Sequence, residues 1–81
     1  MIDWIIENFP DEELLVADRF DSAIIGIDET SMRIIYSTSK CIEILEENMS
    51  REEAIEFFYY NVKGSYVGEK TPIWCLDSES I

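Results

Sequence analysis

The 81-residue chain has no histidine, two cysteines and three glycines, and each shortage excludes a class of site. Without histidine the chain lacks the commonest metal ligand and general base. Cys41 and Cys75 alone cannot complete a four-ligand zinc site or a disulfide framework. The glycines are too dispersed to form a phosphate-cradling loop. We therefore expect no metal site, no cofactor and no catalytic residues.

Positive charge is also scarce. Eighteen Asp and Glu residues face six Lys and Arg residues, which gives a formal net charge of −12 at pH 7. Proteins that bind nucleic acid or anionic membranes concentrate basic residues on one surface, whereas the six here are scattered. The composition argues against both of these partners. It favours a protein partner, either basic or itself a nucleic-acid-binding protein.

Long apolar runs are missing too. No run approaches the roughly 20 residues that span a bilayer, and no charged-then-apolar leader opens the sequence. We expect a cytoplasmic protein with reduced thiols. What the chain does have is a folding composition, with 47% hydrophobic and 12% aromatic residues. This predicts one small domain over residues 1–81, frayed at 77–81.

The first half of the chain predicts a helix followed by a hairpin. Residues 2–9 place Ile2, Ile5, Ile6 and Phe9 on one helical face and end before Pro10. Residues 11–17 suggest a further helical turn. Residues 23–28 predict a strand, and apolar residues at both parities suggest a central one. A turn then leads to a second, antiparallel strand at 33–36.

The second half predicts two helices and a last strand. The first helix covers 40–47 after possible caps at 37–39. The second opens with the capping box of Ser50 and Glu53 and runs through Val62 to a stop at Gly64. Residues 72–76 predict the third strand, starting at a proline.

This order of elements defines the expected fold. We predict an α+β fold with a small three-stranded antiparallel sheet. Two main helices pack on one face, and a short N-terminal helix accompanies them.

Several segments also match a known group of proteins. They are Asp18–Asp21 before the strand that ends in Gly26, then Lys40–Leu45, Met49–Phe58, Asn61–Val62 with Gly64, Val67–Glu69 and Thr71–Ile73. Together they span roughly residues 18–74 and resemble a group of short uncharacterised proteins carried by bacteriophages and by bacterial genomes as prophage genes. The resemblance implies a phage setting and the cytoplasm of a bacterial host. That group has no assigned activity, so no site residue carries over.

Candidate chemistry within the chain is weak. Cys41, next to Lys40 near a helix start, could have a depressed pKa, but it lacks a histidine base and lies on an apolar stripe. Cys75 alternates with apolar strand residues, so we interpret both as packing cysteines. Close carboxylate pairs arise by chance among 18 acids, and a chain this small rarely encloses a pocket of several hundred Å³. We therefore expect a protein that is not an enzyme.

Two helical features are candidate binding surfaces. The first is acidic, with glutamates on the outer side of both predicted helices: Glu43, Glu46, Glu47, Glu52, Glu53 and Glu56. Such rows can imitate the phosphates of a duplex, or they can simply be solvated outer faces. The second is the aromatic run 57–60, which sweeps nearly the whole helix circumference. Phe58 belongs to the inner face, so Phe57, Tyr59 and Tyr60 lie at its edge or outside, exposed for a contact or covered by other segments.

These features leave three functions in order of preference. The first is a small acidic phage-type accessory protein that binds a host or phage protein, inhibiting a nucleic-acid-binding or defence protein by acidic mimicry. The second is a self-assembling structural or scaffolding protein, a homo-oligomer that uses the aromatic edge. The third is a small-ligand binder.

Overall fold

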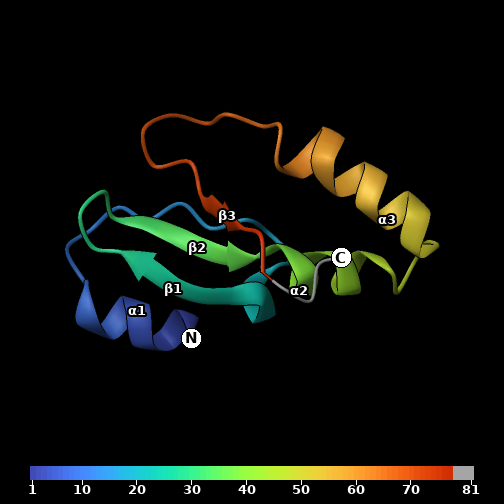
Figure 1. Cartoon of the computed structure of the whole chain (residues 1–81). Helices are drawn as coiled ribbons and strands as arrows, with labels where there is room; N and C mark the ends of the chain where they lie inside the picture. Colours follow the sequence, from blue (N-terminus) through green and yellow to red (C-terminus); the bar gives the residue numbers. More distant parts are fainter. Residues whose placement is uncertain (78–81) are drawn as a thin grey trace.

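A three-stranded mixed sheet organises the computed structural model of the chain, which describes residues 1–77 (Figure 1). The strands are β1 (Ile24–Asp28), β2 (Arg33–Ser37) and β3 (Ile73–Cys75), in the spatial order β1-β2-β3. The helices are α1 (Ile2–Asn8), the 3₁₀ turn η1 (Asp21–Ala23), α2 (Thr38–Leu45), α3 (Arg51–Phe57) and the π-helix η2 (Phe58–Val62). The predicted α+β class is therefore confirmed. Of the predicted frayed end, Asp77 is hydrogen-bonded to the fold and 78–81 lie outside the described residues.

The predicted hairpin is confirmed. β1 and β2 pair antiparallel, and the pair nearest the turn is Asp28 with Arg33. The Asp28 carboxylate accepts hydrogen bonds from the Ser31 hydroxyl at 2.8 Å and from the Thr30 backbone N–H at 3.0 Å. These two bonds hold the pKa of Asp28 below its usual value. A side chain that closes its own turn in this way fixes the strand register.

A β-bulge in β1 corrects the prediction of a central strand. The register shifts between Ile24 and Gly26, so that Ile24 pairs with Tyr36 and Ile27 pairs with Ile34. Two isoleucines three positions apart therefore face the same buried layer, and Ile25 between them is 40% exposed. The bulge therefore explains why this segment has apolar residues at both odd and even positions. β1 is an edge strand and β2 is the central one.

The direction of β3 corrects the sheet topology. β3 runs parallel to β2, with Ile35 opposite Ile73 and Ser37 opposite Cys75. The connection between them holds α2, α3 and η2, which carry the chain back to the end of the sheet where β2 begins. Parallel pairing requires such a long crossover. The prediction of a purely antiparallel sheet is therefore wrong.

Local helix signals were more reliable. Ser37 caps α2 by accepting the Lys40 N–H at 3.2 Å. The capping box of α3 is confirmed, since the Glu53 N–H donates to the Ser50 hydroxyl and the Ser50 N–H donates to the Glu53 carboxylate, both at 3.2 Å. The helix then widens, and the Lys63 N–H donates to the Phe58 carbonyl five residues earlier at 2.8 Å. The predicted α-helix through Val62 is therefore α-helical only as far as Phe57.

The helical turn predicted at 11–17 is wrong. Residues 13–17, here called the strap, have no regular structure. The Ala17 N–H donates to the Tyr36 hydroxyl at 2.6 Å, and this bond ties the strap to the central strand. A backbone group that hydrogen-bonds a core side chain does not need helical partners.

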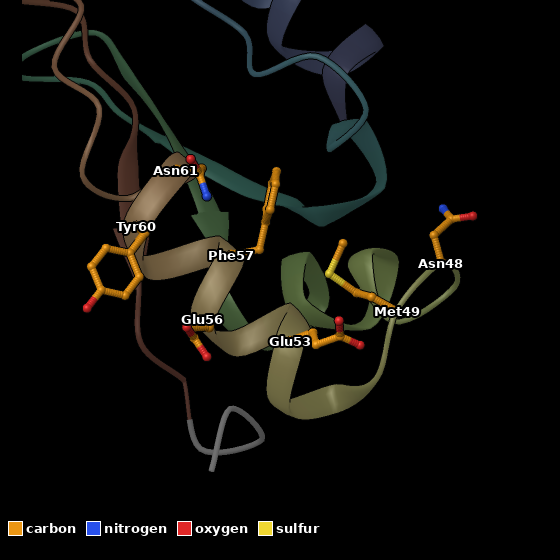
Figure 2. Close-up of a pocket in the computed structure, with 7 residues that line it drawn as sticks. All are labelled: Asn48, Met49, Glu53, Glu56, Phe57, Tyr60 and Asn61. Atoms are coloured by element: carbon orange, nitrogen blue, oxygen red, sulfur yellow. The ribbon is translucent and has the colours of Figure 1, made fainter.

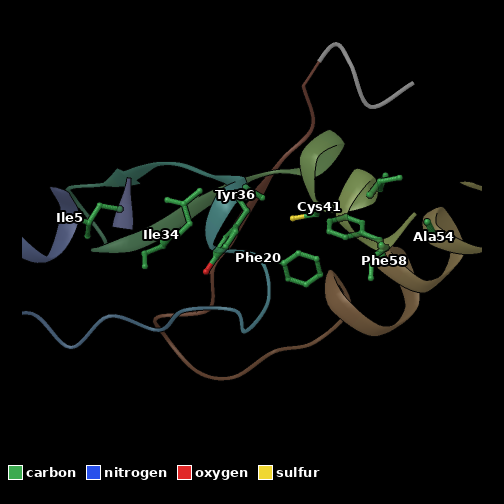
Figure 3. Close-up of a cluster of buried hydrophobic side chains, with 11 residues drawn as sticks. Ile5, Phe20, Ile34, Tyr36, Cys41, Ala54 and Phe58 are labelled. Atoms are coloured by element: carbon green, nitrogen blue, oxygen red, sulfur yellow. The ribbon is translucent and has the colours of Figure 1, made fainter. Parts of the chain in front are cut away.

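The core lies between the sheet, α2 and η2 (Figure 3). Tyr36, Phe58 and Trp74 meet there, with ring centroids 4.9 Å apart for Tyr36–Trp74 and 5.6 Å for Phe58–Trp74. α1 packs beside β1 and inserts Ile5, which is fully buried, whereas Ile6 is 55% exposed and does not share the predicted inner face. α2 packs on β2, and α3 packs on α2, so the end of the α3–η2 helix reaches the sheet through Phe58.

Candidate functional site

The six predicted glutamates have different surroundings. Glu43, Glu47 and Glu52 are exposed. Glu46 is half-buried, and its carboxylate lies 3.1 Å from the Arg51 guanidinium, which offsets its charge. Glu53 and Glu56 together line a hollow on α3 (Figure 2).

This hollow, here called the α3 groove, has a volume of about 740 Å³ and is lined by Asn48, Met49, Glu53, Glu56, Phe57, Tyr60 and Asn61. Four of these come from one helical face, because positions 53, 56, 57 and 60 follow the i, i+3, i+4, i+7 spacing. Met49, in the α2–α3 connection, extends toward Phe57 and forms the wall on the α2 side (Figure 2). The α3 groove is open to solvent and is not an enclosed pocket.

The groove combines negative charge with aromatic surface. The Ser50 backbone and side chain hydrogen-bond to Glu53 and hold its pKa below its usual value, so this carboxylate stays ionised at neutral and mildly acidic pH. Phe57 is 37% exposed and Tyr60 is 79% exposed. None of the groove's lining residues is basic, so the fold itself supplies no counter-ion among them.

The third predicted aromatic lies elsewhere. The Tyr59 ring is 40% exposed and does not line the α3 groove. The Lys63 ammonium lies 5.2 Å from its centroid, and the ring meets Phe58 edge-on at 5.2 Å. Tyr59 therefore already has a cation as a neighbour within the fold. The predicted inner position of Phe58 is confirmed, since it is fully buried.

The two cysteines have different surroundings. Cys41 is fully buried, and burial, with a smaller effect of the Asp77 charge, raises the pKa of its thiol to about 12. Cys75 is half-buried on β3. Within residues 1–77, no three Asp, Glu or Cys side chains come together as a metal site, and no helix has the length and apolarity to cross a bilayer.

Two features escaped the sequence analysis because each joins distant segments. Asp77 accepts hydrogen bonds from the Ser37 and Ser39 hydroxyls and from the Ser39 N–H, which fastens the chain after β3 to the start of α2. A second hollow is lined by strap residues together with residues of η2 and β3. Neither has a local sequence signature, although a buried Ser-Thr-Ser run at 37–39 does indicate unseen hydrogen-bond partners.

Comparisons with known proteins add no family. The chain matches no protein-family model, no curated protein and no solved structure. Function must therefore be inferred from the sites themselves.

Proposed function

We propose that this chain is a protein-binding accessory protein, without enzymatic activity, that receives a basic segment of its partner in the α3 groove. One observation carries the proposal. Two carboxylates, Glu53 and Glu56, and two exposed aromatic rings, Phe57 and Tyr60, line a single hollow whose lining includes no basic residue.

The chemistry of this lining suits arginine and lysine. A guanidinium can pair with a carboxylate through two parallel hydrogen bonds while its plane stacks on an aromatic ring. Burial of Phe57 and Tyr60 by the partner would add apolar contact, which is how aromatic residues anchor interfaces. Arginine fits better than lysine, because its guanidinium can both pair with a carboxylate and stack on an aromatic ring.

The remaining glutamates act at longer range. Glu43, Glu47 and Glu52 are exposed outside the groove and contribute to the net charge of −12. The electric field of this net negative charge accelerates the encounter with a basic surface, and salt weakens the effect. A nucleic-acid-binding protein presents a surface of this kind. The proposed role is therefore inhibition by occupying that surface, which agrees with the phage setting and bacterial cytoplasm that the sequence resemblance implies.

A self-assembling protein is the second candidate. The observation in its favour is the exposure of Tyr60, Tyr59 and Phe57 on one short stretch of helix. Its weakness is electrostatic, since a second copy docked there would bring its own Glu53 and Glu56 near the same acids. Light scattering at rising salt separates the candidates, because assembly by this edge would strengthen as repulsion is screened.

Paired charge removal tests the proposal. The variant Glu53→Gln/Glu56→Gln removes two charges from the groove, and Gln at position 53 preserves the capping box. The matched control Glu43→Gln/Glu47→Gln removes two exposed charges outside the groove, one on α2 and one in the turn after it. With an oligoarginine peptide as probe in calorimetry, the groove variant should lose about tenfold in affinity and the control about twofold. Equal losses of affinity would show that only net charge matters and would contradict the groove as the binding site.

A further inference from the structure

The second hollow, here called the strap cavity, is lined in part by η2 and shares Asn61 with the α3 groove. The strap residues Leu15, Val16 and Ala17 form one wall, and Val62, Val67 and Trp74 contribute to the others. Its volume is about 310 Å³, at the lower end of the range of roughly 300–1,000 Å³ found for small-molecule pockets.

The cavity differs from the rest of the surface in its chemistry. Charged residues make up 30% of the chain, yet none of the residues that line this cavity is charged. Its polar residues are Asn61 and Ser65, and the Ser65 hydroxyl already donates to the Asn61 carbonyl at 3.0 Å. Leu15, Val16 and Val67 at its margin are 40%, 50% and 60% exposed. Clustered exposed apolar side chains around a hollow mark a surface that a ligand covers.

Trp74 supplies a second, independent observation. Its indole nitrogen is shielded from solvent and has no hydrogen-bond partner among the described residues. Buried donors are almost always paired, and an orphan indicates a missing partner. The rings of Tyr36 and Phe58 hold Trp74 in place, so the indole cannot easily turn to find an acceptor of its own.

The local backbone is also unusual. η2, which contributes Asn61 and Val62 to the cavity, is a π-helix. Helices of this type are rare and occur often at functional sites. The opposite wall, the strap, has no regular structure and is tied to β2 by the Ala17–Tyr36 hydrogen bond.

We infer that the strap cavity binds a small, uncharged and mainly apolar molecule that carries one hydrogen-bond acceptor, a carbonyl or ether oxygen, for the Trp74 N–H. The apolar walls select against charged molecules, because burying a charge without a partner is costly. This site lies beyond the proposed protein-binding function and uses a different surface. Asn61 is the one residue that lines both hollows.

Two probes of nearly equal shape test this inference. Acetophenone carries a carbonyl oxygen, and α-methylstyrene replaces that oxygen with a methylene group. The protein is the full chain with Trp4→Phe, so that Trp74 gives the only indole N–H signal in a ¹⁵N-correlated NMR spectrum. Acetophenone should shift that signal downfield and move the amides of the strap, Val62 and Val67. It should bind about tenfold more tightly than α-methylstyrene, which corresponds to one hydrogen bond.

A filled cavity provides the control. Val67→Phe places a ring at the cavity margin and should abolish acetophenone binding, whereas Leu76→Phe, at a residue equally exposed but outside the cavity, should leave it unchanged. The probe comparison uses the unfilled cavity, so it stands even if a variant folds poorly. No response of the cavity amides to either probe at millimolar concentration would overturn the inference. Equal binding of both probes with an unmoved indole signal would overturn the acceptor role, and a response to a protein partner alone would overturn the ligand class.

Discussion

The α3 groove and the strap cavity share Asn61 but differ in how they are built and in the chemistry of their walls. The groove is built by one helical face at regular spacing, with acids and aromatic rings exposed to solvent. The cavity is built by the strap, η2, the following loop and β3, with neutral walls and an unpaired indole. The first is a local pattern and the second a tertiary one. Both hollows include residues of η2, so the packing of η2 should control both.

Phe58→Ala should have the largest effect on this arrangement. Phe58 is fully buried and meets the rings of Trp74 and Tyr59, so its removal should cost about 3–5 kcal/mol in the free energy of unfolding. Urea denaturation measures the loss. Tyr60→Ala, at a residue 79% exposed on the same helix, should change it by no more than about 0.5 kcal/mol. Similar values for the two variants would mean that η2 is not anchored by Phe58.

Tyr36→Phe should loosen the strap and leave α3 unchanged. The change leaves the Ala17 N–H without its acceptor, which should cost about 1–3 kcal/mol and loosen the strap. Denaturant melts give the cost, and amide hydrogen exchange locates it. Exchange should accelerate at Ala17 and its neighbours and remain unchanged at α3. Uniform acceleration through both regions would contradict an independent strap.

Ser50→Ala should destabilise α3, the helix that lines the α3 groove. It removes the acceptor of the Glu53 N–H at the start of α3 and should cost about 0.5–2 kcal/mol. Ser50→Thr keeps a capping hydroxyl and should recover most of the stability. Thermal melts of the two variants provide the comparison. A Ser50→Ala protein as stable as the parent would show that the capping box does not hold the groove helix.

The smallest effect concerns pH. The pKa of Glu53 is lowered in the folded protein, so its contribution to stability is present above the unfolded-state pKa and is lost as pH falls through the lower folded-state value. Glu53→Gln cannot titrate, so its stability should depend less on pH below the usual value of 4.5. Melting curves of both proteins through that interval test this. Parallel pH profiles would rule out a Glu53 contribution.

Local signals in the sequence predicted local structure well. The Ser50–Glu53 spacing gave the capping box, the Asp28–Ser31 turn gave the hairpin, and the aromatic run correctly placed Phe58 inside. Each of these depends on residues within a few positions of one another. The sequence analysis named the glutamates and the aromatic residues of this helix as two separate candidate surfaces and did not predict that members of both line one hollow.

Features that depend on distant contacts were missed. The direction of β3 depends on how α2, α3 and η2 return the chain, and the bulge in β1 appears only when β2 is paired with it. Residues 11–17 have acids suited to a first helical turn, but the Tyr36 hydroxyl captures the Ala17 N–H and the segment becomes a strap. The strap cavity follows from that same contact, so the sequence alone could not reveal it.

In the proposed function the α3 groove receives the basic partner, which does not spread over all the acidic faces. The most direct measurement is an NMR titration of the ¹⁵N-labelled chain with an oligoarginine peptide at low and physiological salt. The largest shifts should fall on residues 53–60, should weaken with salt, and should leave the Trp74 indole signal unmoved. Shifts of equal size along α2 and α3, or largest shifts near Glu43 and Glu47, would rule out the α3 groove as the binding site.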